Sequence, residues 1–113
     1  MKYVMLIMDG PELGSITQER RDALYQEIYA WYEKWGGTPQ LSDGGQQLQP
    51  PATAKTIRAA GVTDGPFIET KEAIGGYSVL EASTIDEAVQ IAGSWPGIAE
   101  GWTTIEVRPA IEM

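Results

Sequence analysis

"KYVMLIM", residues 2–8, is an apolar run that ends at the turn-forming sequence Asp9-Gly10-Pro11. Its length and its ending predict a β-strand. Both alternating sets of side chains are apolar, so both faces of this strand need cover. A chain of 113 residues is too short for helical layers on both faces. The run therefore predicts a sheet with helices on one face and a second subunit on the other.

Two segments outside this strand have helical patterns. The first runs to about Trp35, with either Ser15 or Thr17 as its N-cap, and Gly36-Gly37 supplies its stop. Its apolar residues recur at helical spacing, as do those of the second segment, which follows a capping box made by Thr84 and Glu87. In the second helix the pattern predicts a narrow inward face of Ile85, Ala88, Val89 and Ala92.

Two further runs have the pattern of strands. "AIGGYSVLEA", residues 73–82, is an apolar run typical of a central strand. "TTIEVR", residues 103–108, alternates, which places Ile105 and Val107 inward and Arg108 outward.

The middle of the chain, residues 38–61, is polar and rich in turn signals. Asp43-Gly44-Gly45 and Pro50-Pro51 indicate turns or loops, and residues 53–59 alternate weakly, as in an exposed strand. This region predicts a loosely specified hairpin.

The order strand, helix, hairpin, strand, helix, strand predicts an α+β domain with an antiparallel sheet and two helices on one face. This is the ferredoxin-like βαββαβ arrangement, here a single domain over residues 1–113. Because the open face of the sheet is apolar, we expect it to be buried in a homodimer.

Composition excludes several function classes. The formal net charge of −8 opposes binding to a phosphate backbone, so we expect no nucleic-acid partner. No run approaches the length of a membrane span and none has the pattern of a signal peptide, so we expect a cytoplasmic protein without a membrane partner. The chain has neither Cys nor His, which excludes thiolate nucleophiles, His-based triads and sites with Cys or His metal ligands. The sequence identifies no cofactor and no metal site.

"VTDGPFIETKE", residues 62–72, supports two interpretations. As a structural element it is a turn, in which Asp64 accepts backbone hydrogen bonds and Pro66 fixes φ. As a functional element it gathers Glu69, Lys71 and Glu72 near aromatic residues, an environment that can shift a carboxylate pKa toward a general base or an anion clamp.

Arg108 and the tryptophans also have two interpretations each. Arg108 is able to hold an anionic group by bidentate hydrogen bonds, or to pair with Glu106 or Glu81 across the sheet. The four tryptophans are candidates for a pocket lining, but Trp31 and Trp35 lie on the apolar stripe of the first helix, which favours a core role.

The strings "LQPPATAKTIR", "VTDGPFIETKEAIGGYSVLEASTIDEAVQIAGSWP" and "IEVRPAIE" together resemble the DGPF subgroup of the YCII-related family. The resemblance covers nearly the whole chain. It implies a ferredoxin-like fold that pairs as a dimeric α/β barrel. An enzymatic role for the family has been proposed from an acidic residue and a histidine in a cleft, and some DGPF members are encoded beside extracytoplasmic-function sigma factors. This chain lacks histidine, which excludes a His–Asp mechanism.

Two functional hypotheses follow. The first is a dimeric small-molecule-binding protein or enzyme with an acidic cleft around Asp64. Asp64 and Lys71 are its candidate catalytic residues, and its candidate ligand-binding residues are Phe67, Glu69, Glu72, Tyr77 and Arg108. The second is a non-catalytic dimeric accessory or regulatory module, linked to a sigma-factor system, in which the DGPF loop is structural or binds a partner.

Overall fold

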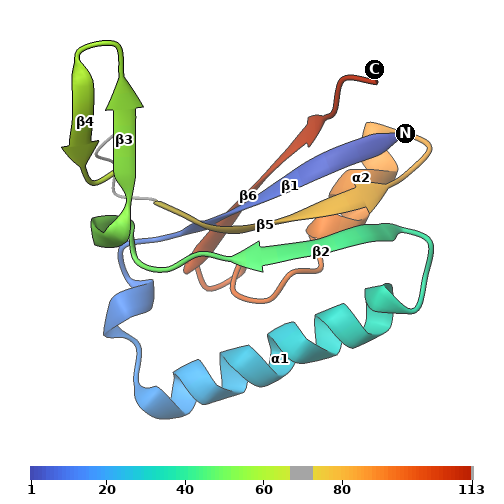
Figure 1. Cartoon of the computed structure of the whole chain (residues 1–113). Helices are drawn as coiled ribbons and strands as arrows, with labels where there is room; N and C mark the ends of the chain where they lie inside the picture. Colours follow the sequence, from blue (N-terminus) through green and yellow to red (C-terminus); the bar gives the residue numbers. More distant parts are fainter. Residues whose placement is uncertain (67–72, 113) are drawn as a thin grey trace.

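The computed structural model describes residues 1–66 and 73–112. Four strands form one antiparallel sheet in the order β2-β5-β1-β6 (Figure 1). They are β1 (Lys2–Asp9), β2 (Leu41–Gln47), β5 (Ala73–Glu81) and β6 (Thr103–Pro109). The two α-helices, α1 (Gln18–Gly36) and α2 (Ile85–Ala92), pack on one face of this sheet. The fold is therefore the predicted ferredoxin-like α+β arrangement.

A hairpin is inserted between β2 and β5. Its strands, β3 (Lys55–Arg58) and β4 (Gly61–Asp64), pair only with each other and form a separate two-stranded sheet. We call this hairpin the arm. It stands away from the main sheet on the side opposite α1 (Figure 1). The exposed strand predicted over residues 53–59 is confirmed as β3.

The two helices begin at side-chain caps. The Thr17 hydroxyl accepts a hydrogen bond from the Arg20 backbone N–H at 3.2 Å, so Thr17, not Ser15, is the N-cap of α1. The Thr84 hydroxyl accepts from the Glu87 N–H at 3.1 Å, which confirms the predicted cap of α2. Two short 3₁₀ helices, Leu13–Ser15 and Pro51–Thr53, lie in the connections.

The prediction of a turn or loop at residues 43–45 was wrong, because these residues lie within β2. The β2–β5 register shifts twice around them. Gly45 has φ 71°, and its N–H donates to the Asp43 carboxylate at 2.8 Å, which is turn geometry inside an edge strand. The local turn signal was real, but pairing with β5 incorporates it as a bulge.

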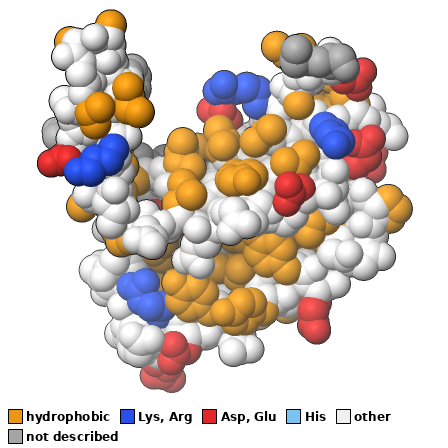
Figure 2. Space-filling view, viewed as in Figure 1, with side chains coloured by type: hydrophobic (Ala, Val, Ile, Leu, Met, Phe, Trp, Pro, Cys, Tyr) orange, Lys and Arg blue, Asp and Glu red, His pale blue; other side chains and the backbone are white. Residues whose placement is uncertain are grey.

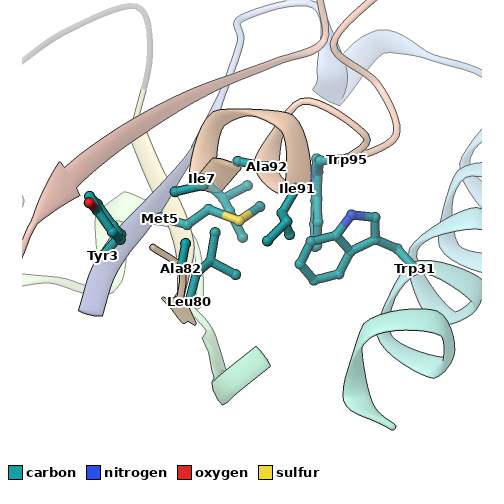
Figure 3. Close-up of a cluster of buried hydrophobic side chains, with 10 residues drawn as sticks. Tyr3, Met5, Ile7, Trp31, Leu80, Ala82, Ile91, Ala92 and Trp95 are labelled. Atoms are coloured by element: carbon teal, nitrogen blue, oxygen red, sulfur yellow. The ribbon is translucent and has the colours of Figure 1, made fainter. Parts of the chain in front are cut away.

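The core lies between the sheet and the helices. Met5 of β1 and Leu80 of β5 are fully buried in one cluster with Ile91 and Trp31 (Figure 3). The Trp31 indole N–H donates to the Ser94 hydroxyl at 2.9 Å, which satisfies the polar atom of a buried ring.

The predicted inward face of α2 is correct only in part. Ala88, Ile91 and Ala92 are buried, whereas Ile85 and Val89 are 43% and 51% exposed. The buried stripe of this eight-residue helix is thus rotated toward Ile91.

The other face of the sheet is apolar and lacks a helical cover. Its central side chains, Val4, Leu6 and Val79, are only partly buried. Figure 2 shows hydrophobic side chains gathered over this face, beside the arm. We call this surface the open face. Within residues 1–66 and 73–112, no helix is long and apolar enough to cross a membrane.

Candidate functional site

A cavity of about 900 Å³ lies on the helix-covered side of the sheet, where β1 and β5 meet α1. Its floor comes from the strands, through Ile7 and Gly76. Its walls are aromatic and aliphatic side chains, and its rim is the segment from Gln46 to Pro51. The lining from α1 and the following segments comprises Leu24, Tyr25, Ile28, Tyr29, Tyr32 and Trp95. A largely apolar cavity that also presents polar side chains is the usual form of a small-molecule site.

Asp9 supplies the one carboxylate among the described residues that line the cavity. It is the last residue of β1. Its side chain is half-buried and lines the cavity. No described residue donates a hydrogen bond to it or pairs with it. Burial disfavours the charged form of the Asp9 carboxyl, and this raises its pKa above the ordinary value of 3.8. A carboxyl with a raised pKa can hold or transfer a proton closer to neutral pH.

Gly75 makes room for this carboxylate. A Cβ atom at Gly75 would lie 2.2 Å from Asp9 Oδ2, well inside contact distance. The β1–β5 register shifts between Ile7 and Met8, just before Asp9. Such an irregularity changes the direction of the side chains that follow it, and Asp9 faces the cavity. This glycine, inside the predicted central strand, thus allows the acid to be placed there.

The aromatic wall is held rigidly. Tyr32 and Trp95 meet edge to face with ring centroids 5.5 Å apart, and Trp31 lies behind them, 5.0 Å from Trp95. The Tyr32 hydroxyl donates to the Gly44 carbonyl and contacts the Ser78 hydroxyl, each at 3.3 Å. These contacts join α1 to β2 and β5, so the wall is largely pre-formed.

Arg21 is the basic residue of the described lining. It lies in the first turns of α1, and its Nη2 donates to the Leu13 carbonyl at 3.0 Å. No carboxylate among the described residues lies within ion-pair distance of it.

The residues predicted from sequence occupy other parts of the molecule. Asp64 is exposed on the arm, where its carboxylate pairs with the Lys55 ammonium. Tyr77 lies on the open face opposite Leu6. Arg108 is exposed on β6, on the other side of β1, where it stands opposite Val4 and pairs with Glu106 at 2.6 Å. None of these three residues lines the cavity, and Phe67, Glu69, Lys71 and Glu72 lie outside the described residues. An acidic cleft around Asp64 stays a prediction.

Sequence reasoning passed over Asp9, Gly75 and Arg21. Asp9 was read only as punctuation after the first strand, although a carboxylate directly after a buried strand is a position where function tends to sit. Arg21 stands three residues before Leu24 and seven before Ile28, in line with the apolar stripe of the first helix, and a charged residue in that line was the signal that could have found it. Within the described residues, no three acidic side chains cluster closely enough to hold a metal ion.

Comparison with known proteins agrees with this architecture. A solved structure, the 5-chloro-2-hydroxyhydroquinone dehydrochlorinase TftG from Burkholderia phenoliruptrix AC1100 in complex with 2,5-dihydroxybenzoquinone, has a similar fold, with a TM-score of 0.59. It is 18% identical, and the match covers 100% of this chain and 96% of that one. The uncharacterized protein R00369 of Rhizobium meliloti (strain 1021) is 29% identical, over 96% of this chain and 91% of its own. The model of the YCII-related domain matches residues 1–113, and the chain therefore belongs to the YCII-related family.

Proposed function

We propose that this protein binds a small planar molecule in the cavity between α1 and the sheet, and that Asp9 exchanges a proton with it. The observation that carries the proposal is a half-buried carboxyl without a protein partner among the described residues, set in an aromatic cavity of about 900 Å³. An unpaired buried carboxylate costs stability, and such costs are commonly retained for function. The cavity volume falls within the range usual for small-molecule sites.

The structural neighbour supports the class of ligand. TftG is described as a dehydrochlorinase of a hydroxylated aromatic compound, and it was solved with a quinone bound. A flat ring of that kind matches aromatic walls such as those of Tyr32 and Trp95. We therefore place hydroxylated aromatic compounds and quinones first among the candidate ligands.

The test is a broad metabolite screen of the purified protein by ligand-observed NMR, repeated with Asp9→Asn and Asp64→Asn. Asp9→Asn keeps the shape of the side chain and removes its charge, so we expect it to weaken binding about tenfold or more, the usual effect of losing a hydrogen bond to a charged group. Asp64→Asn is the matched control on the arm. If Asp64→Asn abolished binding and Asp9→Asn did not, the site would move to the loop predicted from sequence. If no compound bound the wild type, the proposed function would fail.

The working unit that we propose is a homodimer joined through the open face. Its support is the partly exposed apolar surface of Val4, Leu6 and Val79, which two-sided apolar patterning of the first strand anticipates. From the string DGPF at residues 64–67, we also propose that the chain belongs to the DGPF subgroup of its family.

A second candidate function is that of a non-catalytic accessory or regulatory module. The arm favours it. Ile57 and Val62 face each other across the two strands and are 79% and 62% exposed, and a two-stranded hairpin gains little stability alone. A pull-down with wild type and with Ile57→Ser/Val62→Ser tests this function, which requires a reproducible partner that the double variant loses.

A further inference from the structure

The cavity holds two charges of opposite sign that do not neutralise each other. Asp9 and Arg21 both line it, yet no ion pair or hydrogen bond joins them. Oppositely charged groups in a partly dry cavity lower their energy by pairing with each other or with a ligand. Asp9 and Arg21 have no such partner among the described residues, so a ligand in the cavity is the partner left for both.

Arg21 is fixed in place with donors to spare. A guanidinium carries five N–H donors in a planar fork. One of these atoms, Nη2, is held by the Leu13 carbonyl, which orients the fork and leaves other donors without a carboxylate among the described residues. An oriented guanidinium is a specific anchor for a carboxylate or another planar oxyanion.

A short connection in the chain links the two charged residues. Asp9 is followed directly by Gly10, whose carbonyl accepts a hydrogen bond from the Leu13 N–H at 3.2 Å. Leu13 in turn holds Arg21. This connection joins the end of β1, which carries Asp9, to the first turn of α1, which carries Arg21, and both side chains line the cavity together with the aromatic residues of α1.

We propose that Arg21 binds the acidic group of the ligand and that Asp9 accepts a hydrogen bond from its hydroxyl group, so that the cavity selects hydroxylated aromatic acids over neutral phenols. The inference rests on the proposed function. It adds a named anchor and a rule of specificity, because a site built to pair an anion discriminates strongly against a ligand that lacks one.

The test uses phenol, benzoate and the three hydroxybenzoate isomers as probes, with dissociation constants measured by NMR titration at constant ionic strength. We expect the best hydroxybenzoate to bind at least tenfold more tightly than phenol. Arg21→Gln should weaken its binding about tenfold or more, because charge-assisted hydrogen bonds are lost, and should leave phenol unchanged. Asp9→Asn should weaken the hydroxybenzoate and leave benzoate unchanged.

Arg20→Gln is the matched control, since Arg20 is the adjacent arginine, lies 6.0 Å from the centroid of Trp102, and does not line the cavity. It should bind all probes as the wild type does. Equal affinity of wild type and Arg21→Gln for every probe that binds would overturn the role of Arg21 and leave the proposed function standing. Tighter binding of phenol than of all the acids would overturn the specificity rule. Absence of binding by these probes and throughout the metabolite screen would overturn both proposals.

Discussion

The Asp9 carboxyl lowers the stability of the folded protein, and it is also the group that we propose exchanges a proton with the ligand. Its carboxyl is desolvated at the end of β1, so the fold disfavours the charged form and the pKa is raised above 3.8. The arrangement requires glycine at position 75, because a Cβ atom there would collide with the Asp9 carboxylate. The position would be a poor choice for stability alone, since an uncharged side chain would fit there at lower cost.

Asp9→Asn should therefore stabilise the protein at neutral pH. Below the unfolded-state pKa of 3.8 the carboxyl is protonated in both states, and the wild type bears no charging cost. As pH rises through the raised pKa of the folded state, the folded protein must ionise a buried group, so wild-type stability falls relative to the variant. Thermal unfolding at pH 7 and at pH 3 measures this. The gain should be present at pH 7 and absent at pH 3.

Asp64→Asn is the control for that prediction, because Asp64 is exposed and its ion pair with Lys55 is at the surface. Surface pairs contribute little, so this variant should unfold close to the wild type at both pH values. A lower stability of Asp9→Asn at pH 7 would mean that the Asp9 carboxylate has a stabilising partner.

Individual residues also mark the limit of sequence interpretation. Asp9 is followed by Gly-Pro, so turn chemistry accounted for it fully without reference to a cavity. Asp64 carried the same local signals, and the sequence offered no reason to prefer Asp9. The difference between them is burial, which depends on the pairing of the end of β1 with β5 and β6, segments distant in the sequence.

The elements that were predicted from the sequence are those whose local pattern agrees with their packing in the fold. The strands β1, β5 and β6 and both helices were predicted, because hydrophobic periodicity and caps agree with the final packing. β2 was missed because an edge strand with Asp43-Gly44-Gly45 at its centre has the composition of a turn. Only pairing with β5 makes it a strand.

The bulge in β2 leads to a prediction that compares two adjacent glycines. Gly45 has φ 71°, and a Cβ there would lie 1.8 Å from the Tyr77 carbonyl oxygen, so Gly45→Ala should lose about 2 kcal/mol or more of unfolding free energy. At Gly44 a Cβ would lie 3.7 Å from the Tyr32 ring, an ordinary contact, so Gly44→Ala should change it by less than about 1 kcal/mol. Urea unfolding measures both. Equal losses would contradict the assignment of the bulge to Gly45.

For the whole molecule, the main question is what covers the open face. The helices cover one side of the sheet, where Met5 and Leu80 are fully buried, and leave Val4, Leu6 and Val79 partly exposed on the other. An apolar surface across the centre of a sheet is a common mark of association. The arm projects on the same side as this face, so a second copy resting there would lie beside it (Figure 1).

Leu6→Glu should convert the proposed dimer into a monomer. Leu6 is at the centre of the open face, between Tyr77 and Glu106 on the neighbouring strands, and a carboxylate there would be buried without a partner in the dimer. In the monomer the same side chain is partly exposed, so the variant should still fold. Light scattering at micromolar concentration should give half the wild-type mass, with circular dichroism confirming the fold. Val89→Glu introduces the same charge at an exposed apolar residue of α2, on the helix-covered side, and should remain dimeric. A monomeric wild type, or a Leu6→Glu variant of unchanged mass, would rule out association through the open face.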